Sequence, residues 1–155
     1  MDVIVSWLLM LTIMWARYIL VAGLAYMVFY VWGKRKFITK KIQQHFPPIK
    51  NINREFKYSS LTMFIFSLVG LCIGIARMNG YTLIYSDYYA YPRGYFMCSI
   101  LLAVFIHDTY FYWTHRLMHH KRIFKYVHRV HHLSHNPTPL AAFSFHPIEA
   151  VIEAG

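Results

Sequence analysis

The sequence predicts an all-α integral membrane protein, a bundle of about three membrane-spanning helices with a cytosolic histidine-rich helical cap. Of the 155 residues, 57% are hydrophobic, 19% are aromatic and only 14% are charged, which is too apolar for an ordinary soluble domain. Three long stretches are almost free of charge, and nine of the ten histidines lie between His107 and His146, around the end of the third stretch. These observations place most of the histidines around one end of a membrane helix.

The first apolar stretch, residues 3–32, contains one charge, Arg17. A helix of that length reaches roughly 45 Å, which exceeds the roughly 30 Å hydrocarbon core but is too short for two spans. We predict one span that ends near Trp32, with its N-terminal part tilted or in the interface. Arg17 either extends to the interface or faces other helices, and the sequence leaves both open. No basic segment precedes this stretch, so we expect an anchor rather than a signal peptide.

The second span is expected at residues 58–76, which carry no charge. Residues 33–57 before it are interpreted as a basic loop that holds eight Lys and Arg residues against Glu55 alone, with Pro47-Pro48 breaking any helix. The formal charge of +10 would suit nucleic acid. However, the basic residues flank apolar stretches as they do in membrane proteins, so we predict no nucleic-acid partner.

The third span is expected at residues 94–113, after a loop with a turn at Asn79-Gly80. Residues 114–135 are predicted to continue as a cytosolic helix. Pro147 at a first helical position suggests that another helix starts near His146. The positive-inside rule places the basic loop and the histidines in the cytosol, and the intervening loop outside.

Two short histidine clusters lie within the predicted cytosolic helix. Residues three or four apart share a helix face, so His115 and His119 should point the same way, as should His128, His131 and His132. Neutral imidazole is the commonest metal ligand, and two such faces brought together would hold more than one ion. We therefore predict that these five histidines bind metal.

Four further side chains are candidates to support these ligands. Asp108, Tyr112, His115 and His119 step along one face of a helix, so Asp108 would accept a proton from a metal-bound imidazole. A helix-packing hydrogen bond explains Asp108 equally well. His135 and His146 are the other two candidates, whereas we interpret His45 and His120 as solvated surface.

The identity of the metal follows only in part from the ligand types. Arg116 stands where a zinc metalloprotease has glutamate, and the two cysteines lie in apolar stretches away from the histidines, which excludes a thiolate site. Imidazole ligands suit iron, copper, zinc and nickel. Many imidazoles around two adjacent ions favour iron that activates dioxygen, but spacing alone does not distinguish iron from zinc.

The run from Asp108 to His120, DTYFYWTHRLMHH, resembles the first histidine box of the fatty acid hydroxylase/sterol desaturase superfamily, and HRVHH at His128–His132 resembles the second. The segment with Pro137-Thr138-Pro139 and Phe145-His146-Pro147 is similar to sterol C-5 desaturases, and residues 119–126 resemble C-4 methylsterol oxidases about as well. We divide the chain into residues 1–93, the N-terminal spans and basic loop, and residues 94–155, a partial domain of this superfamily.

The resemblance implies a membrane-bound di-iron oxidoreductase that uses dioxygen to hydroxylate or desaturate C–H bonds of a sterol or fatty acyl lipid. It also implies an electron donor, either a b-type cytochrome or a ferredoxin with its reductase. The membrane would be the endoplasmic reticulum or a bacterial inner membrane. Beyond the metal ligands, the sequence assigns no catalytic residue.

One departure from the resemblance bears on activity. The superfamily carries a third histidine box, and the sequence ends at Gly155 without it. We therefore expect a C-terminally truncated product or fragment, inactive by itself. The alternatives are a non-catalytic membrane metal-binding protein and, less favoured because the histidines crowd one end of the spans, a haem protein with two histidine ligands.

Overall fold

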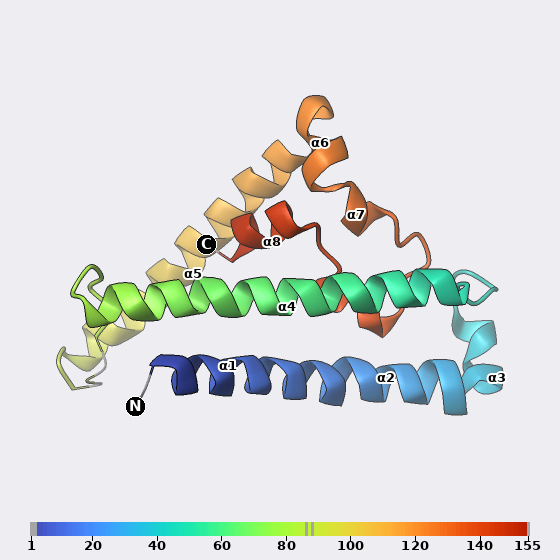
Figure 1. Ribbon diagram of the computed structural model, residues 1–155, viewed down its shortest axis with the longest axis horizontal. Coiled ribbons are helices and arrows are strands. Elements are labelled where there is room, and N and C mark those ends of the chain that lie inside the picture. The colour runs from blue at the N-terminus through green and yellow to red at the C-terminus, as the bar shows by residue number, and fades with distance from the viewer. Residues whose placement is uncertain (1–2, 86, 88, 155) are drawn as a thin grey trace.

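The computed structural model describes residues 3–85, 87 and 89–154, and these residues form helices and connections with no strand among them (Figure 1). Within this described part, three helical stretches are long and apolar enough to cross a membrane, namely Val3–Trp32, Ile49–Met78 and Arg93–Met118. The predicted all-α architecture with three spans is therefore confirmed.

The first span is one continuous helical rod made of four consecutive segments, α1 (Val3–Tyr18), η1 (Ile19–Gly23), α2 (Leu24–Tyr26) and η2 (Met27–Trp32). Its η1 and η2 segments have the wider π-helical hydrogen bonding. The rod ends at Gly33, close to the predicted limit of Trp32. Two short segments then turn the chain, α3 (Lys34–Phe37) and η3 (Ile38–Lys40).

The second span, α4 (Ile49–Met78), lies antiparallel beside α1 (Figure 1). It begins directly after Pro48, so the predicted loop over residues 33–57 is wrong in its second half. Proline breaks a helix from within but is tolerated where a helix starts. The charged residues after it are good helix formers. These charged residues mark where the apolar stretch begins, not where the helix begins.

One face of α4 is polar and fully buried, through Glu55, Ser59, Thr62 and Ser67. The segment after the histidine clusters, which includes η4 (Pro139–Phe143), packs on this face. The carbonyl oxygen of Leu140 accepts hydrogen bonds from Tyr18 Oη at 2.8 Å and from Ser59 Oγ at 2.7 Å. These contacts tie the carboxyl-terminal part of the chain to the first two spans.

The third span, α5 (Arg93–Met118), follows a turn in which Gly80 has φ 75°, as the Asn79-Gly80 pair predicts. It diverges from α1 and α4 and contacts α6 and α8 instead (Figure 1). Its apolar side chains are exposed along most of its length. This direction carries the end of α5 away from the first two spans.

The predicted single helix over residues 114–135 is wrong. Its first residues complete α5, and two short helices follow, α6 (Lys121–Val127) and α7 (Arg129–His132). His120 has extended backbone, and its side chain accepts a hydrogen bond from the N–H of Arg122 at 3.4 Å, which caps α6. The breaks turn the chain back, so α7 does not continue the line of α5.

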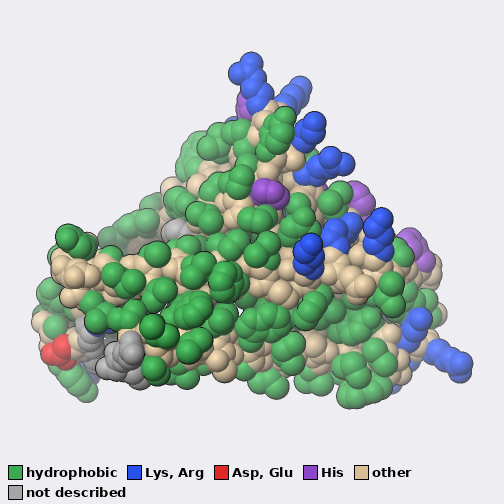
Figure 2. Space-filling model, viewed as in Figure 1, with side chains coloured by type: hydrophobic (Ala, Val, Ile, Leu, Met, Phe, Trp, Pro, Cys, Tyr) green, Lys and Arg blue, Asp and Glu red, His purple; other side chains and the backbone are tan. Residues whose placement is uncertain are grey.

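The last helix, α8 (Pro147–Glu153), starts after His146 as predicted. It lies between α4, α5 and α6 (Figure 1). Figure 2 shows Lys and Arg side chains along the edge that runs from α6 past α7 toward α3, whereas apolar side chains cover much of α1 and α4. The charge distribution thus separates one polar edge from an apolar body.

Candidate metal centre

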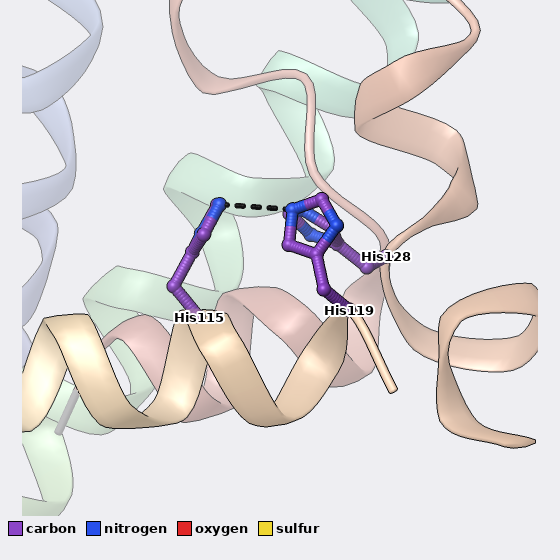
Figure 3. A group of neighbouring side chains, drawn as sticks. All are labelled: His115, His119 and His128. Atoms are coloured by element: carbon purple, nitrogen blue, oxygen red, sulfur yellow. Dashed lines mark hydrogen bonds between the residues drawn. The ribbon is translucent and has the colours of Figure 1, made fainter. Parts of the chain in front are cut away.

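The last turn of α5 presents the first pair of histidines. His115 lies on that turn and His119 caps its end, so the spacing of four residues places both rings on one side (Figure 3). Their Nε2 atoms lie 3.2 Å apart. Two imidazole nitrogens bound to one ion at about 2.1 Å lie roughly 3.0–3.4 Å from each other. The pair therefore has a separation that suits two ligands of one ion.

His128 follows α6 in the chain, and its ring lies beside that of His119 (Figure 3). Its ring centroid lies 4.6 Å from that of His115 and 4.6 Å from that of His119. One ring nitrogen from each of the three lies within 4.8 Å of the others. His128 is fully buried, whereas His119 is exposed. The three rings form a group that is able to hold a metal ion.

The short helix α7 adds the other two predicted ligands. His132 has its ring centroid 4.7 Å from that of His128 and 5.0 Å from that of His119. His131 lies 5.5 Å from His128, and its other face packs against Phe145 at 5.4 Å. The structure thus brings all five predicted histidines into one cluster.

The cluster disfavours positive charge on its own rings. Burial and the four neighbouring imidazoles lower the pKa of His128 to about 3. Burial, followed by the nearby rings, also lowers the pKa of His131 and the pKa of His132. A neutral imidazole keeps a lone pair for a metal, whereas a protonated one does not. His128 is therefore ready to bind an ion without first losing a proton.

Two ring nitrogens in this cluster are buried without a hydrogen-bond partner, Nε2 of His128 and Nδ1 of His115. Buried polar atoms are normally paired, and an unpaired one needs an explanation. A cation among the rings would explain the nitrogen of His128, which faces the other histidines. The donor set of imidazoles fits iron, copper, zinc or nickel, so the residues present are compatible with the iron that the resemblance implies.

The four side chains predicted to support these ligands lie elsewhere. The Asp108 carboxylate lies 3.5 Å from Nδ1 of His107, and Tyr112 Oη accepts a hydrogen bond from Arg116 at 2.9 Å. His135 is exposed and its carbonyl binds Gln43. His146 caps α8 through a hydrogen bond from the N–H of Ile148. In the described part of the chain, none of the four is hydrogen-bonded to the five clustered histidines. His135 is nevertheless near enough to His132 to contribute to lowering the pKa of that ring.

Sequence reasoning missed a different residue, Glu149. Its carboxylate is fully buried, and Oε1 lies 2.6 Å from Nδ1 of His128. Burial raises the pKa of Glu149 to about 8 in the metal-free chain, and a cation bound to the adjacent histidines would lower it again and favour the carboxylate. The position was assigned only to the start of a helix, because a glutamate at the third position of α8 is already explained by capping. Only the packing of α8 against α4 and α6 reveals its second contact.

The fold and the site define a helical membrane protein with a histidine-rich candidate metal centre. Residues 100–155 match the fatty acid hydroxylase family. A Delta(7)-sterol 5(6)-desaturase of Gibberella zeae is 32% identical over 138 residues, which cover 88% of this chain and 40% of that protein. Human lathosterol oxidase is 30% identical over 116 residues, which cover 73% of this chain and 39% of that protein.

Methylsterol monooxygenase 1 of Rattus norvegicus is 45% identical over 67 residues, covering 43% of this chain and 23% of that protein. These matches confirm the resemblance to the fatty acid hydroxylase/sterol desaturase superfamily, and the three names describe oxidoreductases. The chain spans about two fifths of the length of the first two relatives. No solved structure matches it.

Proposed function

We propose that this protein is an integral-membrane di-iron oxygenase that uses dioxygen to hydroxylate or desaturate a sterol or fatty acyl lipid. The observation that carries the proposal is the cluster of five imidazoles at the end of an apolar helix long enough to span a bilayer. The names of the relatives support a sterol as the first lipid to test.

The proposed ligands are His115, His119, His128, His131 and His132. Bound ferrous iron would supply the reduction of dioxygen and the removal of hydrogen from an unactivated C–H bond. The protein supplies position: α5 and α7 hold the rings on two converging backbones, and neutral imidazoles keep their lone pairs available. Because α5 is itself a candidate span, a lipid can approach this end of the helix from the bilayer.

An apolar cavity is the proposed lipid site. It has a volume of about 470 Å³ and lies between α1, η1, α4 and η4, lined by Met63, Phe66, Ala142 and Phe143 among others. This volume falls in the range of typical small-molecule sites. Two residues after Phe143, Phe145 packs on His131, so the segment that lines the cavity also contacts the candidate metal centre. Arg17 is the cationic side chain in the lining.

We also propose that the histidine cluster faces the cytosol. The Lys and Arg residues around α6 and at the start of α4 favour that side by the positive-inside rule. A cytosolic site would receive electrons from a b-type cytochrome or from a ferredoxin with its reductase. The relatives are sterol enzymes by name, which supports the endoplasmic reticulum over a bacterial inner membrane.

The test combines metal analysis with product analysis. Because the 155-residue chain is expected to be inactive by itself, a full-length version that carries the third histidine box is purified and loaded with ferrous iron without air. It is then returned to lipid vesicles that contain a Δ7-sterol, a 4-methylsterol or a fatty acyl lipid. Dioxygen and a chemical reductant are then added. We expect oxidised lipid, detected by mass spectrometry, only in the iron-loaded sample. A protein that retains zinc or iron stoichiometrically but oxidises none of these lipids would support the alternative, a non-catalytic membrane metal-binding protein.

A further inference from the structure

Glu149 is the one acidic side chain that touches the histidine cluster in the described part of the chain. It lies on the first turn of α8, which Pro147 begins and His146 caps. The carboxylate is fully buried. Burying a carboxylate is costly unless its oxygens are paired, so the partners of the two oxygens indicate what the residue does.

The two oxygens have different partners. Oε2 accepts a hydrogen bond from the N–H of His146 at 3.3 Å, which completes the cap of α8. Capping requires no more than this contact, and an exposed glutamate would provide it. Oε1 points to Nδ1 of His128 at 2.6 Å. The contact between Oε1 and His128 is therefore not required for capping α8.

The other nitrogen of the His128 ring completes the arrangement. Nε2 is buried and has no hydrogen-bond partner, and the ring lies within 4.6 Å of the His115 and His119 rings. An imidazole that binds metal through Nε2 carries its proton on Nδ1. In this structure, a proton on Nδ1 has Oε1 of Glu149 as its acceptor. The Glu149 carboxylate and the unpaired Nε2 therefore lie at opposite ends of the His128 ring.

We propose that Glu149 is a positioning residue for the metal centre: its carboxylate accepts the Nδ1 proton of His128 and holds the ring so that Nε2 faces the metal. This inference rests on the proposed function, because it assumes that His128 is a ligand. A carboxylate at the far nitrogen sets the tautomer and the ring orientation and strengthens the ligand. The residue contacts no reacting atom and acts through His128.

The test measures metal binding directly. Apo protein in detergent is titrated with ferrous iron without air, and bound metal is determined after separation. Glu149→Gln keeps the shape of the side chain but removes its charge, and we expect ferrous affinity to fall about 10–100-fold. Glu153→Gln is the matched control, since Glu153 is a partly buried glutamate one turn later on α8. We expect the ferrous affinity of the control to stay within about twofold of that of the unmodified protein. This change is much smaller than the loss typical of a ligand-supporting contact.

A spectroscopic measurement separates positioning from a purely structural role. In zinc-loaded protein with nitrogen-15 labelled histidine, a strong hydrogen bond to a carboxylate moves the Nδ1 proton of His128 far downfield. We expect this signal to disappear in His128→Ala and to move upfield in Glu149→Gln, but not in Glu153→Gln. A variant that only loosens α8 would lower the unfolding temperature of the apo protein and leave the signal of the folded fraction in place.

The outcomes distinguish this inference from the proposed function. Glu149→Gln with the ferrous affinity and the Nδ1 signal of Glu153→Gln would overturn the positioning role, even where His128→Ala loses metal. Unchanged metal binding in His128→Ala would rule out His128 as a ligand, which contradicts the ligand set of the proposed metal centre. Loss of metal in both His128→Ala and Glu149→Gln, with a retained fold and a moved proton signal, supports both.

Discussion

The Glu55 carboxylate on α4 accepts two hydrogen bonds from Thr138, one from its N–H at 3.2 Å and one from its hydroxyl at 2.7 Å. Both residues are buried. The contact joins the second span to the segment that leads from the histidine clusters into η4. Because η4 and α8 follow directly, this pair helps to set where Glu149 meets His128.

Removing this acceptor should destabilise the protein. Glu55→Ala leaves the N–H and the hydroxyl proton of Thr138 buried without an acceptor, which costs about 1–3 kcal/mol for each group. We expect a clearly lower unfolding temperature in detergent, followed by circular dichroism. Glu55→Gln retains one acceptor oxygen and should lose less. Lys57→Ala, an exposed position on the same helix, is the control, and equal stability of Glu55→Ala and Lys57→Ala would contradict the prediction.

Replacing a proposed ligand should remove metal and activity together. In a full-length version that carries the third histidine box, we expect His128→Ala to retain little iron and to lose lipid oxidation, because a buried imidazole with a free nitrogen is lost from the centre of the cluster. His45→Ala is the matched control, since His45 is exposed in the connection before α4. The measurement is iron content beside product formation. Normal iron content and turnover in His128→Ala would rule this residue out as a ligand.

The orientation in the membrane is open to a labelling test. In a Cys72→Ser, Cys98→Ser background, single cysteines at Lys40, Leu83 and Lys125, three exposed positions, are treated with an impermeant thiol reagent in sealed vesicles whose non-cytosolic face is outward. The positive-inside rule predicts that the Leu83 site reacts and that the other two react only after permeabilisation. Reaction at Lys125 but not at Leu83 would reverse the orientation.

The apolar cavity gives a prediction that separates lipid binding from metal binding. Ala142 lines the cavity, and Ala142→Trp, made in the full-length version, would occupy part of its volume. We expect a rise in KM, or loss of oxidation of bulky lipids, with iron content unchanged. Ala103→Trp on the exposed surface of α5 is the control, and it should have no such effect. Equal kinetics in the two variants would place the lipid elsewhere.

The sequence was sufficient for the three spans, the turn at Gly80 and the start of α8. These features depend on local composition: charge-free length, a residue that tolerates positive φ, and proline at a first helical position. The spacing of histidines also indicated which rings would gather. Local periodicity was enough for His115 and His119, because both belong to the end of one helix.

Only the tertiary structure shows how the histidines at 128–132 are brought next to His115 and His119. A continuous helix over residues 114–135 would carry His128 away from His115, whereas the breaks at His120 and His128 return it. No local pattern specifies that reversal, since it depends on how α6 and α7 pack.

The contact between Glu149 and His128 likewise depends on long-range packing. In the sequence it is a helix-capping residue, and as such it needs no further partner. In the structure, α8 packs on α4 and α6, and this removes the carboxylate from water. A buried carboxylate must find a donor, and the ring of His128 is the group that α6 and α7 place within its reach. The sequence by itself determined the three apolar spans and the types of candidate ligand. Long-range packing determined which side chains meet, because burial and hydrogen bonding between distant segments are properties of the folded chain.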